Sequence, residues 1–306
     1  MTVLSPLSDL HIGRGYRLGP LTWFPVWTAD PVGPRGYVTD RSADLAVSEA
    51  KQARVPTLDV TNSGDSSVLI FEGTIFEGGW QHRTVVRTTL VPAHQSLALP
   101  VVCVEAGRWD DSSSTQWSAG RVAPARVRSA TRNLRRSEQG QVSLGAPDQS
   151  RVWREVSDYQ ARTRSSSRTE SMVEIAQEAE KSLSDAEMIR ALPGQRGVIV
   201  AALGRPMAFE LYDHPDTLAE RLPGILRGFA LDAMGQPYVE TPSRRPRQFA
   251  EVVSRVPVTE SDRDHATLRR RSIENPAIAT EAIFTSDDSL LHLLAFNARH
   301  ELVLAA

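Results

Sequence analysis

The chain has almost no lysine and a single cysteine. Only Lys51 and Lys181 are lysines among 35 basic residues, and Cys103 is the one cysteine in 306 residues. One cysteine excludes an intramolecular disulfide and a cysteine-rich metal cage, so packing has to stabilise the fold. The lysine deficit is typical of a GC-rich genome, although arginine also suits bidentate anion contacts and interface ion pairs.

Long hydrophobic runs are also missing. No window approaches the roughly 18 apolar residues that a membrane-spanning helix needs, and residues 1–17 lack the basic and apolar regions of a secretory signal. We therefore expect a cytoplasmic protein without membrane contact. The composition, 41% hydrophobic and 24% charged, is that of a soluble globular protein and excludes fibrous and disordered classes.

Motifs for metals, cofactors and phosphate are not found in the sequence. The seven histidines are scattered, with no His-Glu-x-x-His, no Cys-x-x-Cys and no phosphate-binding loop. The best local group, Asp213-His214-Pro215-Asp216, is better explained by Asp216 capping the next helix. We expect neither a metal nor a cofactor.

The first half of the chain is predicted to be rich in strands. Segments of β-branched and aromatic residues occur at 21–27, 57–61, 67–71, 83–91 and 97–104, separated by Gly, Asn and Pro turns. The polar stretch 43–53 is compatible with a short helix. Several short strands favour a sandwich or open barrel in this half.

Opposite charges follow one another in the middle of the chain. Residues 121–168 hold eleven arginines and four acids, a balance of +7, whereas 169–191 hold six acids and two basic residues, a balance of −4. Capping boxes at Ser171/Glu174 and Ser184/Glu187 predict two helices in the acidic segment. We interpret 111–168 as an arginine-rich connector.

Three arginines of this connector are candidate interaction residues. If 124–138 is helical, Arg128, Arg132 and Arg135 share one face and would suit a polyanion. The net charge of −2 disfavours nucleic acid, because dedicated nucleic-acid binders carry excess positive charge. Pairing with the acidic segment, within one chain or between copies, is the preferred interpretation.

The last third is predicted to alternate between strands and helices. A strand at 197–203 and its hairpin partner at 207–212 precede a helix from 216 to 234, whose apolar residues recur every three to four positions. A shorter helix at 246–253 and closing strands at 277–284 and 290–296 follow. The fold class is therefore α+β, with a β-rich N-terminal half and a mixed C-terminal half packed on it.

Two polar clusters are candidate ligand-binding sites. Gln81, His82 and Arg83 follow the glycine pair 78–79, where polar groups either face a ligand or stabilise a bulge. Residues 103–109 place a thiol and a carboxylate on one strand face, followed by Arg108 and Trp109. With a histidine alongside they would form a nucleophilic site, but a cysteine in so apolar a strand is more typical of packing.

The same residues carry a family resemblance. Gly73-x-x-x-x-Gly-Gly-Trp-Gln-His-Arg83, Leu90-Val-Pro-Ala93 and Val102-Cys-Val-Glu-Ala-Gly-Arg-Trp109 resemble the bacterial ADP-ribosylglycohydrolase and rhodanese-phosphatase-associated (ARPP) proteins, a family of unknown function. Asp148-Gln-x-x-Val-Trp153 and the segment 197–233 are similar to it too. The resemblance implies a single α+β domain over 18–296, between an extension at 1–17 and a tail at 297–306.

Two classes of function remain open. The missing catalytic motif favours a non-catalytic binding or self-assembly protein, whose partner is itself or another protein. The alternative is an enzyme or sensor for a nucleotide-like or ADP-ribose-like ligand. Its candidate ligand-binding residues are Gln81, His82, Arg83, Glu105, Arg108 and Trp109, and no catalytic residue is assigned.

Overall fold

The computed structural model describes residues 7, 9–50, 56–136, 142–143, 145–181, 189–256, 259–264, 268–275 and 277–304. The chain divides into two compact units whose segments alternate along the sequence. Unit 1 comprises Met1–Gly33, Leu134–Gly145 and Asp185–Ala306, and unit 2 comprises Pro34–Asn133 and Ala146–Ser184. The described residues contain both helices and antiparallel strands, so the α+β class is confirmed.

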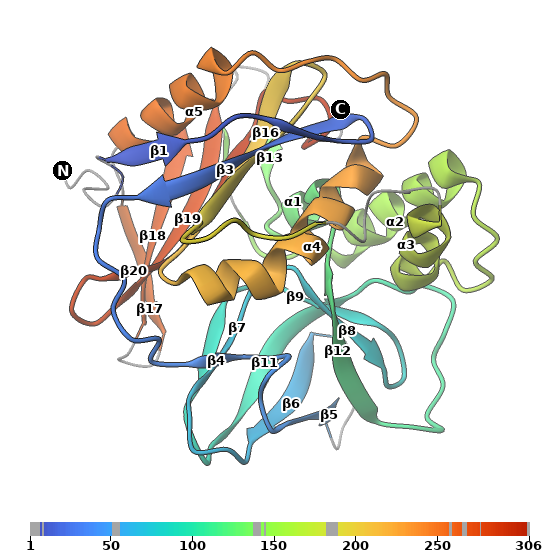
Figure 1. Cartoon of the computed structure of the whole chain (residues 1–306). Helices are drawn as coiled ribbons and strands as arrows, with labels where there is room; N and C mark the ends of the chain where they lie inside the picture. The colour runs from blue at the N-terminus through green and yellow to red at the C-terminus, as the bar shows by residue number, and fades with distance from the viewer. Residues whose placement is uncertain are drawn as a thin grey trace. The chain divides into compact units, whose positions relative to one another are not determined.

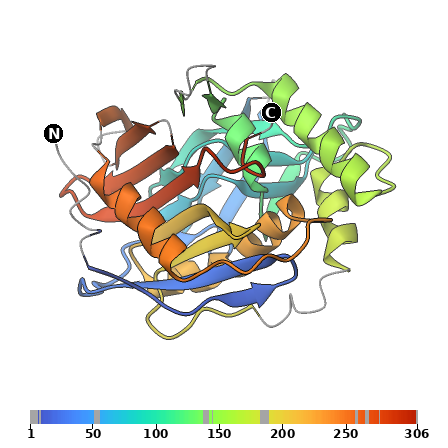
Figure 2. The same cartoon turned by 90° about the horizontal axis from the view of Figure 1, so that it is seen from above.

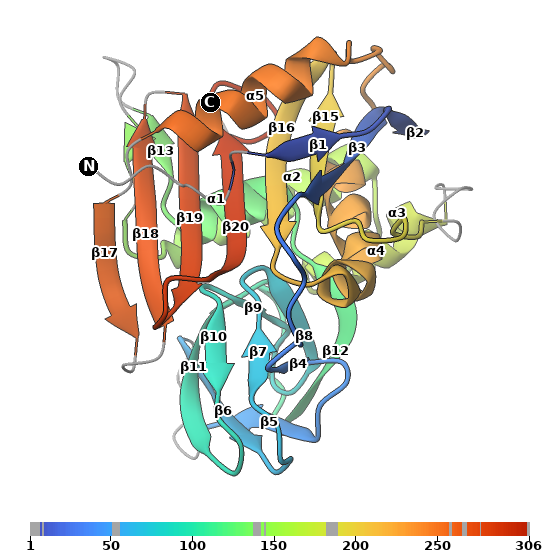
Figure 3. The same ribbon diagram turned by 60° about the vertical axis from the view of Figure 1, so that its left-hand side comes forward.

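Unit 1 is built on a nine-stranded sheet (Figure 3). Its strand order is β1-β3-β15-β16-β20-β19-β18-β17, and β2 pairs with β3. The strands are β1 (Leu10–Ile12), β2 (Tyr16–Leu18), β3 (Leu21–Thr28), β15 (Gly197–Ala202), β16 (Arg205–Tyr212), β17 (Thr259–Asp264), β18 (Leu268–Asn275), β19 (Ile278–Thr285) and β20 (Leu290–Asn297). A short ribbon of β13 (Arg135–Arg136) and β14 (Val142–Ser143) lies in the same unit.

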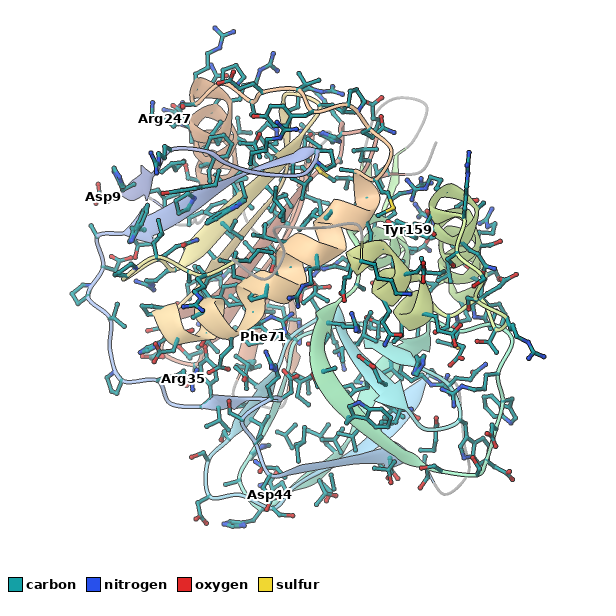
Figure 4. The ribbon with its side chains drawn as sticks, turned by 45° about the vertical axis from the view of Figure 1, so that its right-hand side comes forward. Asp9, Arg35, Asp44, Phe71, Tyr159 and Arg247 are labelled. Atoms are coloured by element: carbon teal, nitrogen blue, oxygen red, sulfur yellow. The ribbon has the colours of Figure 1, made fainter. Side chains whose placement is uncertain are left out.

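Two helices pack on this sheet. α5 (Arg244–Arg255) buries Phe249, Ala250 and Val253 against the sheet's apolar residues and crosses it in Figure 2, while Arg247 lies on its outer side in Figure 4. α4 (Pro215–Asp232) packs on β15 and β16. The expected Asp216 cap is wrong: the His214 side chain accepts the Asp216 N–H at 3.2 Å, because Pro215 occupies the first helical position.

Unit 2 contains a closed six-stranded barrel (Figure 1). Its order is β11-β6-β5-β12-β8-β9, so the barrel expected from the sequence is closed rather than open. The strands are β5 (Leu45–Glu49), β6 (Thr57–Asn62), β8 (Thr74–Gly78), β9 (Arg83–Val85), β11 (Ser96–Cys103) and β12 (Thr115–Val122). Beside it lies a three-stranded sheet of β4 (Val38–Thr39), β7 (Val68–Ile70) and β10 (Thr89–Val91).

Three helices complete unit 2: α1 (Ala125–Thr131), α2 (Gln149–Thr163) and α3 (Met172–Glu180). α2 buries Val152, Val156 and Tyr159, which recur at helical spacing; Tyr159 is labelled in Figure 4. The predicted cap of α3 is confirmed, since Ser171 Oγ accepts the Glu174 N–H at 3.4 Å. The second predicted capping box lies outside the described residues.

Several sequence-based assignments are wrong. Residues 43–53 are not helical where described, because 45–49 form β5. The arginine-rich connector at 111–168 contains β12, α1 and α2. β3 belongs to the sheet of the C-terminal half, where Val26 pairs with Gly197.

None of the described helices is long and apolar enough to cross a membrane.

The three candidate interaction arginines do not form a surface stripe. Arg128 is 1% exposed and Arg132 is 6% exposed, and both approach the buried carboxylate of Glu72. Arg135 follows the end of α1 and lies in unit 1. The prediction that the three arginines share one helix face is therefore wrong. Arg128 and Arg132 are buried, so a polyanion does not reach them.

Other arginines of the basic segment pair with glutamates of α2 and α3 in unit 2. Arg121 lies 2.6 Å from Glu180 of α3, and Arg126 lies 2.8 Å from Glu155 of α2. Of these two pairs, Arg121 with Glu180 joins the basic segment to the acidic segment, and it does so inside unit 2, whereas Glu155 belongs to the basic segment itself.

Candidate functional site

The candidate site is built around a glycine turn at the end of β8. Gly78 and Gly79 have φ values of +90° and +56°. A Cβ on Gly78 would lie 2.2 Å from the Trp117 ring, and a Cβ on Gly79 would lie 2.5 Å from Gln116 Nε2. Backbone conformation and close approach both require glycine here, so the turn places β9 and its polar side chains in one fixed position.

Strand alternation directs Arg83 into the barrel. Arg83 lies opposite Phe76 in the β8–β9 pair, and Phe76 belongs to the barrel core. Glu49 follows the core residue Val47 by two positions, so it faces the same way.

Four side chains form what we call the inner network: Glu49, Gln81, Arg83 and Gln116, all buried. Arg83 Nη1 donates to Gln81 Oε1 at 2.8 Å, and Arg83 Nη2 donates to Glu49 Oε1 at 3.5 Å. Gln116 Nε2 donates to Glu49 Oε1 and to the Gln81 carbonyl, each at 3.1 Å. The network fixes one polar end of an otherwise apolar barrel.

A second group, the outer cluster, consists of His82, Glu105, Arg108 and Thr169. The Glu105 carboxylate accepts from the His82 N–H at 3.1 Å, from Arg108 Nε at 2.9 Å and from Thr169 Oγ1 at 2.8 Å. Arg108 also donates to the carbonyls of Gly79 at 2.6 Å and Gly78 at 3.2 Å. The cluster therefore joins the glycine turn to the segment before α3.

The His82 ring is held as one neutral tautomer. Its Nδ1 accepts the Gly78 N–H at 3.0 Å, which puts the ring proton on Nε2. Nε2 lies 3.7 Å from Glu105 Oε2. Burial lowers the pKa of His82, and the opposing charge of Glu105 does not offset it.

Cys103 is not arranged as a nucleophile. Its thiol donates to the Glu105 carbonyl at 2.8 Å and receives a hydrogen bond from the indole of Trp153. Burial raises the pKa of the thiol despite the nearby charge of Arg83. The packing role favoured by the sequence fits these contacts, because a reactive cysteine needs a lowered pKa and access.

Acidic groups that the sequence analysis did not single out lie close by. Glu77 accepts from Arg121 Nε at 3.0 Å, and burial raises the pKa of Glu77 although Arg121 opposes the shift.

Among the described residues, no group of three or more His, Cys, Asp or Glu side chains is placed to hold a metal ion.

Two tryptophans stand exposed beside the glycine turn. Trp109 is 52% exposed and Trp117 is 54% exposed. Trp109 meets Trp80 edge to face with centroids 5.1 Å apart, and Arg83 Cζ lies 5.8 Å from the Trp109 ring centre. We call Trp109 and Trp117 the tryptophan rim.

All six candidate ligand residues therefore lie at one place in unit 2. Gln81 Nε2 donates to the Glu105 carbonyl at 2.9 Å, which links the two sequence clusters directly. The barrel wall separates their roles: Gln81 and Arg83 face inward, whereas Arg108 and Trp109 retain exposed surface. Ligand binding by these residues stays a prediction.

The pH dependence of stability tests the environment of His82. The unfolded chain binds a proton at this residue near pH 6.5, whereas the folded chain binds it only at lower pH. Lowering the pH through that range therefore favours unfolding. We expect the unfolding free energy to fall between pH 8 and about pH 5 more steeply in the native protein than in His82→Asn, which keeps an acceptor for the Gly78 N–H.

Urea unfolding at several pH values measures this difference. His300, whose pKa burial also lowers, titrates alike in both proteins and cancels in the comparison. Parallel stability curves for the two proteins would contradict the assigned environment of His82.

The fold and site together define an α+β protein with a buried polar network at one end of a small barrel. The chain belongs to the family described as ARG and Rhodanese-Phosphatase-superfamily-associated Protein domain, whose model matches residues 9–296. The predicted family is thus confirmed, and the match spans segments of both units. Searches of curated proteins and of solved structures found no match.

Proposed function

We propose that the protein is a non-catalytic self-assembly protein that associates through the tryptophan rim. The main observation behind this proposal is that both indole side chains are more than half exposed next to the glycine turn. Tryptophan is costly to leave in water and is enriched among the residues that dominate protein interfaces. A surface held by the outer cluster loses little conformational freedom on association.

The chemistry of the clusters supports a non-catalytic role. The Cys103 thiol is buried and protonated, and the Glu105 carboxylate is held by three donors from the protein itself. Since Arg121 and Arg126 already pair within unit 2, apolar contact rather than charge is the proposed driving force between copies.

Sedimentation velocity over a range of protein and salt concentrations tests the proposal. Association through indoles persists at high salt, whereas association through charged segments weakens. We expect Trp109→Ser with Trp117→Ser to weaken association by at least about tenfold, equivalent to 1.4 kcal/mol. The matched control is Val252→Ser, which removes an exposed apolar residue of α5. A native protein that is monomeric at every concentration refutes self-assembly.

A second candidate is a sensor for a nucleotide-like or ADP-ribose-like ligand. It is favoured by the exposed ring of Trp109 and the partly exposed guanidinium of Arg108, on neighbouring residues of the chain, since aromatic stacking with a cation suits nucleotides. Saturable quenching of tryptophan fluorescence by ADP-ribose, with ribose and phosphate as controls, is the expected result. If the tryptophan fluorescence does not change up to about 1 mM ADP-ribose, binding with a dissociation constant of about 1 mM or less is excluded.

A further inference from the structure

The inner network contains more polar atoms than its own hydrogen bonds satisfy. Glu49 Oε2, Gln116 Oε1 and Arg83 Nε are buried and have no hydrogen-bond partner in the protein. Each belongs to a side chain that is more than nine-tenths buried. An unsatisfied buried polar atom costs about 1–3 kcal/mol, and more when the group is charged.

The polar groups that carry these three atoms meet at one oxygen. Arg83 Nη2 and Gln116 Nε2 both donate to the same oxygen, Glu49 Oε1, at 3.5 and 3.1 Å. Covalent geometry places each unsatisfied atom only about 2–2.5 Å from the atom of its own side chain that makes this contact. Each unsatisfied atom therefore belongs to a polar group that meets its neighbours at Glu49 Oε1.

The chemistry of the three atoms is specific. Glu49 Oε2 and Gln116 Oε1 are acceptors and require hydrogen-bond donors, whereas the Arg83 Nε–H is a donor and requires an acceptor. A molecule that binds all three has to donate twice and accept once. An ammonium ion does not meet this requirement, because it has no lone pair for Arg83.

We propose that one internal water molecule binds at the polar end of the barrel, donating to Glu49 Oε2 and Gln116 Oε1 and accepting from Arg83 Nε–H. Hydrogen bonds of about 2.7–3.2 Å let a water bridge atoms up to about 6 Å apart. Side chains fill the interior of small barrels, which favours water over an organic ligand. Buried waters of this kind make about three hydrogen bonds to otherwise unsatisfied groups.

Trp109 is the exchange route in this proposal. Its ring lies 5.8 Å from Arg83 Cζ on one side and is half exposed. Displacement of the indole gives the water a path to solvent, so Trp109 controls how long the water stays. The water site itself does not require self-assembly, because its three ligand atoms belong to the inner network, whereas its exchange route shares Trp109 with the rim.

Two measurements test the proposal. A crystal structure of the native full chain at high resolution is expected to show one solvent peak within about 3.2 Å of all three atoms. Oxygen-17 magnetic relaxation dispersion is expected to count one long-lived water fewer in Glu49→Leu/Arg83→Met/Gln116→Met. The control is Val101→Ala, which enlarges the same apolar interior and gains no water, because apolar cavities stay dry.

The crystallographic measurement needs no variant, so the proposal can be refuted even if the triple variant does not fold. Three results would each overturn the proposal. They are a crystal structure with no solvent peak at the polar end, a peak too large for water, and an unchanged count of long-lived waters in the folded triple variant. Trp109→Ala is expected to shorten the residence time of the water. An unchanged residence time rejects the exchange route.

Discussion

Replacing Glu105 by alanine is expected to destabilise the protein by about 3–5 kcal/mol, as for the loss of one partner of a buried ion pair. Glu105 is 2% exposed, and its carboxylate accepts from His82, Arg108 and Thr169. Without it, three donors lose their acceptor. Urea unfolding monitored by far-UV circular dichroism measures the change.

The reverse truncation is the matched control. Arg108 is a quarter exposed, so Arg108→Ala leaves Glu105 with His82 and Thr169 and admits water to the vacated position. We expect the cost to be smaller than for Glu105→Ala. A loss below about 1 kcal/mol for Glu105→Ala would mean that the outer cluster does not hold the turn.

The same variant has a predictable pH dependence. Burial raises the pKa of Glu105, but the hydrogen bonds from Arg108, the His82 N–H and Thr169 outweigh it, so the folded pKa is lowered. The resulting stabilisation is complete above the unfolded pKa of about 4.3 and is lost as the pH falls through the folded value. The deficit of Glu105→Ala should therefore shrink in acid.

Arg83→Met is expected to cost a similar amount, about 3–5 kcal/mol. Arg83 is fully buried, and its removal takes the positive charge from the buried Glu49 carboxylate and leaves Gln116 as its side-chain donor. The methionine has nearly the volume of the arginine stem, so the loss reports charge rather than packing. The unfolding free energy from urea titration is again the measure.

The double variant Glu49→Leu/Arg83→Met separates these causes. Removing both charges together is expected to recover a large part of the loss, because no uncompensated ion remains in the barrel. If the double variant is as unstable as Arg83→Met alone, the arginine acts through packing and not through its pairing with Glu49.

The sequence predicts the apolar strands well and the polar ones poorly. β15 is buried throughout, β11 is a long segment rich in apolar residues, and α4 presents a helical repeat, so all three were predicted. β5 and β12 were missed because their pattern is inverted at the barrel's polar end. There Glu49 and Gln116 face inward while Trp117 faces solvent, which contradicts the rule that apolar residues lie inside.

The sequence identifies residues of the candidate site but does not predict how they are arranged in space. The residue types of both clusters were identified, but Glu49, Gln116 and Thr169 were not, because they come from distant segments. Thr169 lies 64 positions after Glu105, and tertiary packing alone brings them together. The buried ion pair of Arg128 was not predicted for the same reason, since its partner Glu72 lies 56 positions away.

The pairing of β3 with β15 imposes an order on folding during synthesis. Val26 of β3 can pair with β15 only after the ribosome has made Gly197, the residue opposite it in that strand. At about 5–20 residues per second, the ribosome leaves β3 without this partner for roughly 10–35 s. The barrel strands all emerge within that interval, so unit 2 can close its hydrogen bonds first. During this time β3 can pair with β1 and β2 alone, so the large sheet of unit 1 completes only when the last third of the chain has been made.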